Sequence, residues 1–448
     1  EGIRAANFYL KETAGLTFDE WKYSDDYEAI MKEFTNYQYE VRFLRAYFYF
    51  ELIKRYRNIP FVLDVLAQNE ANGVNPESYE KIAKFIVDEC SDLAQILPVN
   101  YDNFSTKEKG RVTRAAAMAL KSRVTLYMAS PLFSEDSEDK WKQAAEAAYD
   151  IIKQKTDLGL DLVPYPQIFN DVNNQKAEVI LYRPTGESGD FEKANFPIGV
   201  EGGKTSTCPT QNLMEAYDMK DGTPFVWNNQ SNPYDNRDPR MKYTIVCNEM
   251  KWPVDPVEIW EGGTNGLPLQ NATTTGYYLK KYVNNTISFE AGSTVTKKQH
   301  NWVLFRYGEI LLNYAEAMIN AFHDPNYKDA VYNMSAREAV NQIRGRTNIS
   351  LPGFPSDITE KDFVKRLKNE RRVELAFEGH RFWDVRRWKE GDKHFKNIVE
   401  MKITKNGDDT YTYERKVKER SWDDKMYFFP IPQSEKSKNP NLEQNPGW

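Results

Sequence analysis

The chain has little of what metal centres and disulfide frameworks need. Its 448 residues include three cysteines and four histidines. A sparse, odd set of cysteines does not make a disulfide framework, and the scattered histidines lack the close pairing of a zinc site. We therefore expect no cofactor and no metal. Calcium at the acids flanking Ser137 is an alternative, but a solvated helix start explains these acids better; they are Glu135, Asp136, Glu138 and Asp139.

The chain also lacks an excess of positive charge and a long apolar run. Its 60 Lys and Arg stand against 66 Asp and Glu, for a net charge of −6. Nucleic-acid binding rests on neutralising phosphates, so this balance argues against nucleic acid as a partner. No stretch approaches the roughly 18 apolar residues of a membrane helix. No signal peptide is visible and the first residue is Glu1, so we expect a processed or trimmed product.

Helical patterns dominate both ends of the chain, and the middle differs from them. Apolar residues at three- and four-residue spacing predict helices at 39–56, 79–97, 113–130, 137–153, 302–322, 335–346 and 359–377. From about 158 to 299 this period is lost and Gly, Pro and Asn turn signals are frequent. Short strands are predicted there at 179–182 and 242–246. We expect a helical body that carries a long, irregular insertion.

The most informative stretch is ERRVELAFEGHRFWDVRRW at 370–388. Glu370, Glu374 and Glu378 recur every four residues, and Gly379 suits the left-handed conformation that ends a helix. A carboxylate-rich helix could hold the acid–base pair of a glycosidase. Glutamates interleaved with arginines, however, most simply form a structural ion network. We therefore expect two helices joined by aromatic packing and charge pairs.

This block is one of several segments that together resemble the SusD/RagB family. The family comprises surface lipoproteins of Bacteroidetes that capture nutrients beside a TonB-dependent transporter. The order and completeness of the segments make the resemblance specific. The other segments include RFLRAYFYF at 42–50, GRVTRAAA at 110–117, RYGEILLNYAEA at 306–317 and FPIP at 429–432.

The resemblance implies a mainly α fold, a SusD-like α/α superhelix of tetratricopeptide-like helix pairs with a long loop-rich insertion and a few short strands. It implies one domain over 1–448, with the helical scaffold at about 1–157 and 300–448 and the ligand-facing region at about 158–299. Members usually begin with a signal peptide, a lipid-modified cysteine and a longer N-terminal part. We therefore expect the N-terminal anchor segment to be missing.

The resemblance also implies binding without catalysis. Such a protein is lipid-anchored at the outer-membrane surface, captures an oligosaccharide or polysaccharide, and delivers it to a SusC-like TonB-dependent transporter. Membrane contact is implied only through the lost anchor. The alternatives are a peptide-binding member of the family, a glycoside hydrolase with a carboxylate pair, and a helical scaffold that binds no ligand.

The ligand-contacting residues are expected among the aromatics between 225 and 305. Rings pack against the flat C–H faces of sugars, and amides pair with their hydroxyls. We expect Tyr243, in a strand-like run, and Trp302, at the start of a predicted helix, to be core residues. Rings in irregular, Pro- and Gly-rich sequence are better candidates. The candidate ligand-binding residues are Trp227, Trp252, Trp260, Asn271, Tyr277 and Tyr278.

Overall fold

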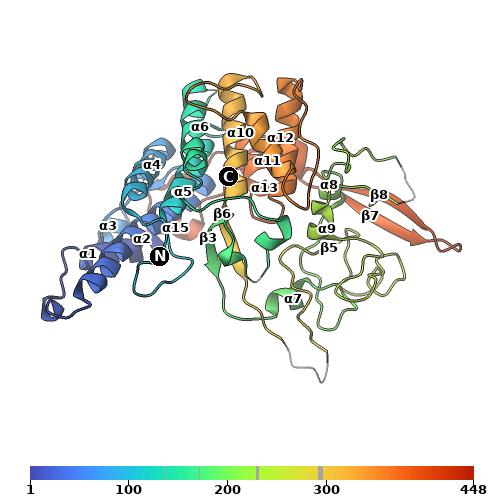
Figure 1. Cartoon of the computed structure of the whole chain (residues 1–448), viewed down its shortest axis with the longest axis horizontal. Coiled ribbons are helices and arrows are strands. Elements are labelled where there is room, and N and C mark those ends of the chain that lie inside the picture. The colour runs from blue at the N-terminus through green and yellow to red at the C-terminus, as the bar shows by residue number, and fades with distance from the viewer. Residues whose placement is uncertain (136, 171, 229–231, 291–295) are drawn as a thin grey trace.

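The computed structural model describes residues 1–135, 137–170, 172–228, 232–290 and 296–448 (Figure 1). Its main body is an array of helices in which successive members pack side by side. The long helices of the array are α1 (Gly2–Glu12), α2 (Tyr27–Tyr56), α4 (Tyr79–Ile96), α5 (Arg114–Ala129), α6 (Glu138–Lys153), α10 (Tyr307–Phe322), α11 (Ala336–Arg344) and α12 (Glu360–Glu374). The mainly α fold expected from the sequence is confirmed.

The chain leaves this array after α6 and returns to it at α10. The two helices are packed together although residues 154–306 separate them. The intervening chain forms the loop-rich side of the molecule, below and to the right of the helices in Figure 1. The loops are therefore an insertion whose two ends meet at one place in the helical array.

Small residues and hydroxyl caps explain why the helices form and pack closely. In α5, Ala116, Ala117 and Ala119 are fully buried, which lets neighbouring helices approach. Several helices begin at a hydroxyl side chain that accepts a hydrogen bond from the backbone N–H three residues later. These capping residues are Ser78, Thr113, Ser137, Ser335 and Thr359.

The loop-rich side contains short elements held by two-stranded pairings. Strand β3 (Val179–Pro184) pairs antiparallel with β6 (Asn301–Arg306), and β4 (Ile245–Val246) pairs antiparallel with β5 (Tyr278–Leu279). The prediction of a helix from Trp302 was wrong for its first turn, because residues 301–306 complete the ladder with β3. The predicted strand at 242–246 is a strand only at its end. The short helices here are α7 (Asp190–Asn195), α8 (Gln211–Met214), α9 (Arg240–Thr244) and the 3-10 turns η2 (Tyr165–Ile168) and η3 (Asn173–Gln175).

The remaining elements are a hairpin, helix α13 and several short helices and strands. A long hairpin of β7 (Asn397–Lys405) and β8 (Tyr411–Glu419) projects from the molecule at the right of Figure 1 and was not predicted. Helix α13 (Arg381–Arg387) follows α12 after Gly379, whose φ of +83° is the left-handed conformation expected there. The others are η1 (Asp19–Trp21), β1 (Ile59–Pro60), α3 (Gln68–Ala71), β2 (Pro76–Glu77), α14 (Gly391–Phe395), η4 (Asp424–Tyr427) and α15 (Gln433–Lys438).

A buried ion network joins the loop-rich side to α12. Glu374 is fully buried, and its two oxygens accept from Arg240 at 2.8 Å, Arg306 at 2.9 Å and Arg346 at 2.7 Å. Glu370 adds a contact with Arg344 at 2.7 Å and a second one with Arg240. These contacts confirm the structural interpretation of the glutamate series.

The apolar core forms separate clusters in the helical array and on the loop-rich side. One cluster fills the helical array and includes Phe50, Leu120 and Leu311. A second fills the loop-rich side around Met241 and Ile259.

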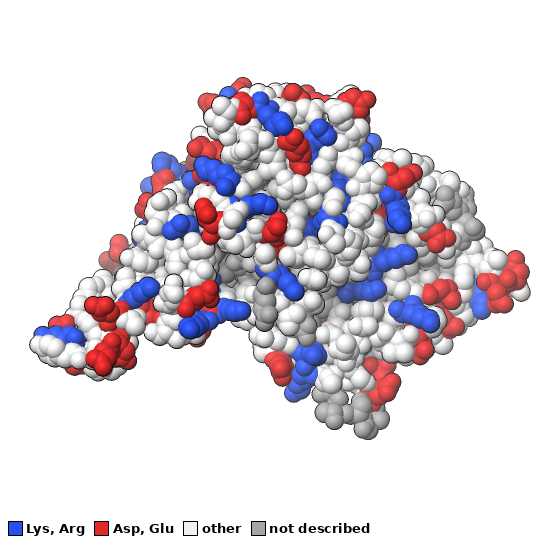
Figure 2. Space-filling model, viewed as in Figure 1, with Lys and Arg blue, Asp and Glu red and all other residues white. Residues whose placement is uncertain are grey.

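Within the part of the chain that the structure describes, no helix combines the length and apolarity needed to cross a bilayer. Figure 2 shows acidic and basic side chains interspersed over the visible face of the helices.

Candidate functional site

A cavity of about 400 Å³ opens on the loop-rich side, near the border with the helical array. It is large enough for a small ligand, since typical ligand sites occupy about 300–1,000 Å³. Four stretches of chain, at 166–170, 243–252, 280–286 and 298–300, form its walls. Its lining residues are Pro166, Phe169, Asn170, Tyr243, Trp252, Lys280, Lys281, Tyr282, Val283, Asn284, Asn285, Thr286, Lys298 and His300. We call it the Tyr243 cavity.

The two strand pairings bring these stretches together. Pairing of Ile245 with Leu279 sets Tyr243, just before β4, beside Lys280, just after β5. The β3–β6 ladder continues past its end, where the N–H of Thr185 donates to the carbonyl of His300 at 3.0 Å. The ends of the β4–β5 and β3–β6 pairings therefore position the residues that form the cavity wall.

Tyr243 supplies the most accessible ring of the cavity. It is half-buried, and its hydroxyl accepts from Nδ2 of Asn348 at 3.3 Å. The other lining rings are those of Phe169, Trp252 and Tyr282, all at most 9 % exposed. A ligand can therefore lie against Tyr243, whereas the other three rings act as walls.

Amide and hydroxyl groups border the rings. Oδ1 of Asn284 accepts from the N–H and the hydroxyl of Thr286, at 2.9 Å and 2.7 Å. The backbone N–H of Asn284 donates to Oε1 of the buried Glu192 at 2.9 Å. These bonds hold the turn, and the exposed side chains of Asn170 and Asn285 stand at the rim.

Cationic side chains also line the cavity. Lys281 is fully buried, and its Nζ donates to Oε1 of Glu378 at 2.8 Å and to the hydroxyl of Tyr165 at 3.0 Å. Burial lowers the pKa of Lys281 to about 8, against the opposing effect of Glu378. His300 lies 3.0 Å from Oε1 of Glu192 through its Nε2. The ammonium of Lys280 lies 5.0 Å from the centre of the Trp252 ring.

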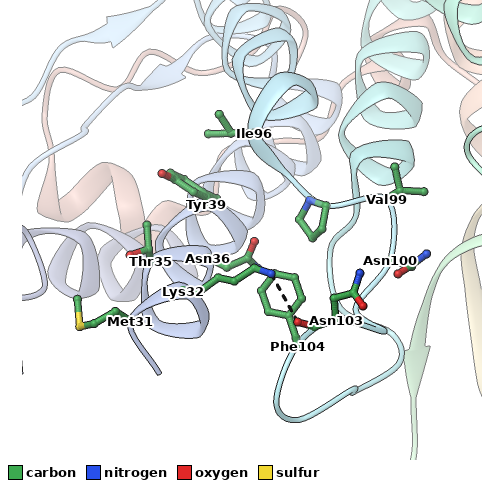
Figure 3. A pocket seen from close by; sticks show the side chains of 11 residues that line it. Met31, Lys32, Thr35, Asn36, Tyr39, Ile96, Val99, Asn100, Asn103 and Phe104 are labelled. Carbon is green, nitrogen blue, oxygen red and sulfur yellow. Dashed lines mark hydrogen bonds between the residues drawn. The ribbon is translucent and has the colours of Figure 1, made fainter. Parts of the chain in front are cut away.

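A larger cavity, of about 600 Å³, lies on the helical side between α2 and the segment that follows α4 (Figure 3). Tyr39 and Asn36 face it from α2. Its lysine, Lys32, is held internally, since Nζ donates to the carbonyl of Asn103 at 3.5 Å and lies 4.5 Å from the centre of the Phe104 ring. We favour the Tyr243 cavity as the functional site because more separate segments converge on it with more ring and polar groups.

The six candidate ligand-binding residues lie in different parts of the structure. Tyr277 and Tyr278 are fully buried in the core of the loop-rich side, where their hydroxyls donate to Oε1 of Gln211 and to the carbonyl of Asn265. The structure does not support the expected contact of these two rings with a ligand, because the second core cluster covers both, Tyr278 in β5 and Tyr277 directly before it. Trp252 lines the Tyr243 cavity but is only 6 % exposed.

The other three candidates lie outside this cavity. Trp260 and Trp227 are half-buried and pack against the second core cluster, and the ammonium of Lys405 lies 5.5 Å from the centre of the Trp260 ring. Asn271 is exposed in a turn, with a φ of +64°. Whether these three contact a ligand stays a prediction. Of the acids proposed as an alternative calcium site, Asp136 lies outside the described residues, and no cluster of three metal-ligating side chains occurs among the described ones.

Sequence reasoning missed most of the residues that form the cavity. Tyr243 was expected in the core, and Asn170, Lys280, Asn284 and His300 were not singled out. Only Lys280 and Asn284 lie near a signal in the sequence, the polar run NNT at 284–286 that directly follows the YYLKKYV stretch at 277–283. A polar turn after a strand marks a place where side chains collect at a sheet edge.

Comparison with known proteins agrees with the fold. The sequence pattern described as the SusD family matches residues 168–448. SusD-like protein P2 of Formosa agariphila is 28 % identical over 165 residues, 35 % of this chain. The match spans 28 % of that relative's length.

Solved structures match over nearly the whole chain. A SusD-like protein from Bacteroides fragilis is 26 % identical with a TM-score of 0.79, over 100 % of this chain and 84 % of that one. A SusD-like carbohydrate-binding protein from the same organism has the same identity and TM-score, over 98 % and 84 %. Surface glycan-binding protein A from Bacteroides uniformis shares the fold at 19 % identity and a TM-score of 0.64, over 99 % and 82 %. With its family pattern covering more than half of its length, this chain belongs to the SusD family.

Proposed function

We propose that this protein binds an oligosaccharide or polysaccharide at the Tyr243 cavity. The observation that carries the proposal is the convergence of the half-buried Tyr243 ring with the side chains of Asn170, Asn284 and Asn285 around one opening. Sugars present a flat C–H face and a border of hydroxyls, which match a ring and surrounding amides. A SusD-like relative of similar fold is described as carbohydrate-binding, which supports this class of ligand.

The proposed activity is capture without catalysis. Hydrolysis of a glycosidic bond needs two carboxyl groups on opposite sides of the bond. None of the described residues that line the Tyr243 cavity is Asp or Glu. The glutamates that first suggested an acid–base pair are occupied by arginines in the interior. These observations favour binding over hydrolysis.

We further propose that the protein works at the outer-membrane surface, held by a lipid anchor, and passes its glycan to a SusC-like TonB-dependent transporter. Membership of the SusD family supports this part of the proposal. Co-purification of a tagged copy with an outer-membrane transporter from native membranes tests it. Recovery of the protein from the soluble fraction without any transporter would contradict it.

A screen of the purified protein on a glycan array, followed by calorimetric titration, tests the binding function. We expect at least one glycan to bind, with tryptophan fluorescence changing on titration because Trp252 lies in the cavity wall. Chromatography of the ligand after long incubation should return it unchanged. Binding of peptides but no glycan would favour a peptide-binding protein, and cleavage of the glycan would favour a hydrolase.

A further inference from the structure

The charges that line the Tyr243 cavity differ from those of the whole chain. The chain carries a net charge of −6. Yet its described cavity lining contains three lysines and a histidine and no acid; the four are Lys280, Lys281, Lys298 and His300. An acidic protein has therefore gathered cationic groups at this opening, which raises the local concentration of anions.

Lys281 and His300 each have a carboxylate of their own. Lys281 is paired with Glu378, and His300 lies against Glu192. Both acids are almost completely buried behind the wall, so these contacts hold the wall in place. Neither group offers an uncompensated charge to a ligand.

Lys280 differs from both. Its side chain is half-buried, with Nζ lying 5.0 Å from the centre of the Trp252 ring and donating to Sδ of Met250 at 3.8 Å. Among the described residues, no carboxylate forms an ion pair with it. Burial lowers the pKa of Lys280, and the nearby Lys242 lowers it further. A partly desolvated ammonium without a counter-ion is stabilised by any anion that reaches it.

We propose that the Tyr243 cavity takes a glycan bearing an anionic substituent, a uronate carboxylate or a sulfate ester, which pairs with Lys280 while a sugar ring packs on Tyr243. This inference rests on the proposed glycan-binding function and names the class of glycan. The neutral side chains of Asn284 and Asn285 remain for the hydroxyls of the sugar.

The test uses three trisaccharides of equal length, namely a neutral one, a trigalacturonate and a monosulfated one, titrated into the full chain by calorimetry. We expect one or both anionic ligands to bind at least tenfold more tightly than the neutral one, as a charge-assisted hydrogen bond allows. The preferred anion distinguishes uronate from sulfate. The difference in affinity between the anionic and the neutral ligands should decrease as the salt concentration rises from 50 to 500 mM.

Two variants locate the effect. Lys280→Met keeps the apolar stem of the side chain and should remove most of the preference for the anion. Lys297→Met removes the same charge from an exposed neighbour of the cavity and should leave the preference intact. Melting temperatures identify a variant that fails to fold, and Lys280→Gln, which also removes the charge, then replaces Lys280→Met.

The outcomes distinguish a failure of the anionic preference from a failure of glycan binding itself. Equal binding of neutral and anionic trisaccharides, unchanged in Lys280→Met, overturns the anionic preference and leaves glycan binding standing. Failure of every glycan on the array, with peptides bound instead, overturns both.

Discussion

At the scale of single residues, the exposure of Tyr243 and of Trp252 is the opposite of what the sequence around each one predicts. Trp252 sits in a Pro-rich loop, yet it is 6 % exposed, with the ammonium of Lys280 lying 5.0 Å from the centre of its ring. Tyr243 sits beside a strand, yet α9 ends next to it and leaves its ring half-buried at the cavity. The local sequence predicts the backbone conformation, whereas the exposure of a side chain depends on which distant segments cover it.

Replacing Tyr243 by Ala should weaken glycan binding about tenfold, because stacking of a ring against a ligand contributes on the order of 1 kcal/mol beyond its buried area. The melting temperature should change little, since the ring is only half-buried. Calorimetric titration with the glycan identified on the array measures the effect.

Two variants serve as controls for that experiment. Tyr243→Phe keeps the ring and should bind nearly as well as the parent. Tyr39→Ala removes a ring from the larger cavity on the helical side and should have no effect on affinity. Loss of binding in Tyr39→Ala but not in Tyr243→Ala would place the ligand in that other cavity.

A buried carboxylate predicts how stability depends on pH. Burial opposes ionisation of Glu316, but Arg387 and the indole N–H of Trp388 outweigh it and lower the pKa of Glu316 to about 2. The unfolded chain protonates this group near its ordinary pKa of 4.5. The stabilisation is therefore complete above about pH 4.5 and is lost as the pH falls toward 2.

Urea unfolding at a series of pH values from 7 to 3 measures this loss. The Glu316→Gln variant should be less stable at pH 7 and should lose less of its remaining stability in acid. An acid response identical to that of the parent would show that Glu316 does not contribute to it.

At the scale of elements, sequence periodicity predicts the long helices well and the short pairings poorly. The predicted helix at 113–130 is α5, Arg114–Ala129, because small apolar residues and a threonine cap specify it locally. Residues 301–306 are apolar enough for a helix, but pairing with β3 outweighs that propensity. The β7–β8 hairpin left a signal in the alternation of Val399, Met401 and Ile403, each buried between more exposed neighbours.

Aromatic contacts and buried charge pairs together hold helix α13 to its neighbours. Removal of the aromatic part in Trp383→Ala should destabilise the fold by about 3 kcal/mol. The Trp383 ring stacks on Phe429 with centroids 6.0 Å apart. The cationic groups of Lys54 and Arg55 lie 4.6 Å and 4.9 Å from the ring centre. Chemical denaturation followed by circular dichroism measures the change.

Trp21 provides the matched control for this tryptophan deletion. Its side chain is 51 % exposed, so Trp21→Ala should change the free energy of unfolding by less than about 0.5 kcal/mol. Stability of Trp383→Ala within error of the parent would contradict the packing role assigned to the 370–388 block.

At the scale of the whole molecule, charge pairs in the interior hold the loop-rich side to the helical array. Arg240 is the first residue of α9 on the loop-rich side, Arg306 lies at the end of β6 and Arg346 in the segment after α11. All three contact Glu374 of α12. The spacing of the glutamates predicts an ion network, but which distant arginines complete it depends on the folded arrangement. We propose that this network makes the two parts unfold as one domain.

Glu374→Gln should therefore destabilise the protein by about 3–5 kcal/mol, because three buried guanidinium groups lose their shared charge partner. Fluorescence and circular dichroism should still report one coincident transition in the parent. Glu138→Gln, which breaks an exposed pair with Lys142, should leave stability unchanged within error. Two separate transitions in the parent would contradict a single cooperative domain.

The central claim is that the Tyr243 cavity is where a glycan binds. A crystal structure of the protein with the oligosaccharide selected on the array tests it most directly. The account predicts a sugar ring packed against Tyr243, with hydroxyls at Asn284 and Asn285 and density ending near Lys280. An oligosaccharide bound beside Tyr39, or on Trp260 with the Tyr243 cavity empty, would contradict it.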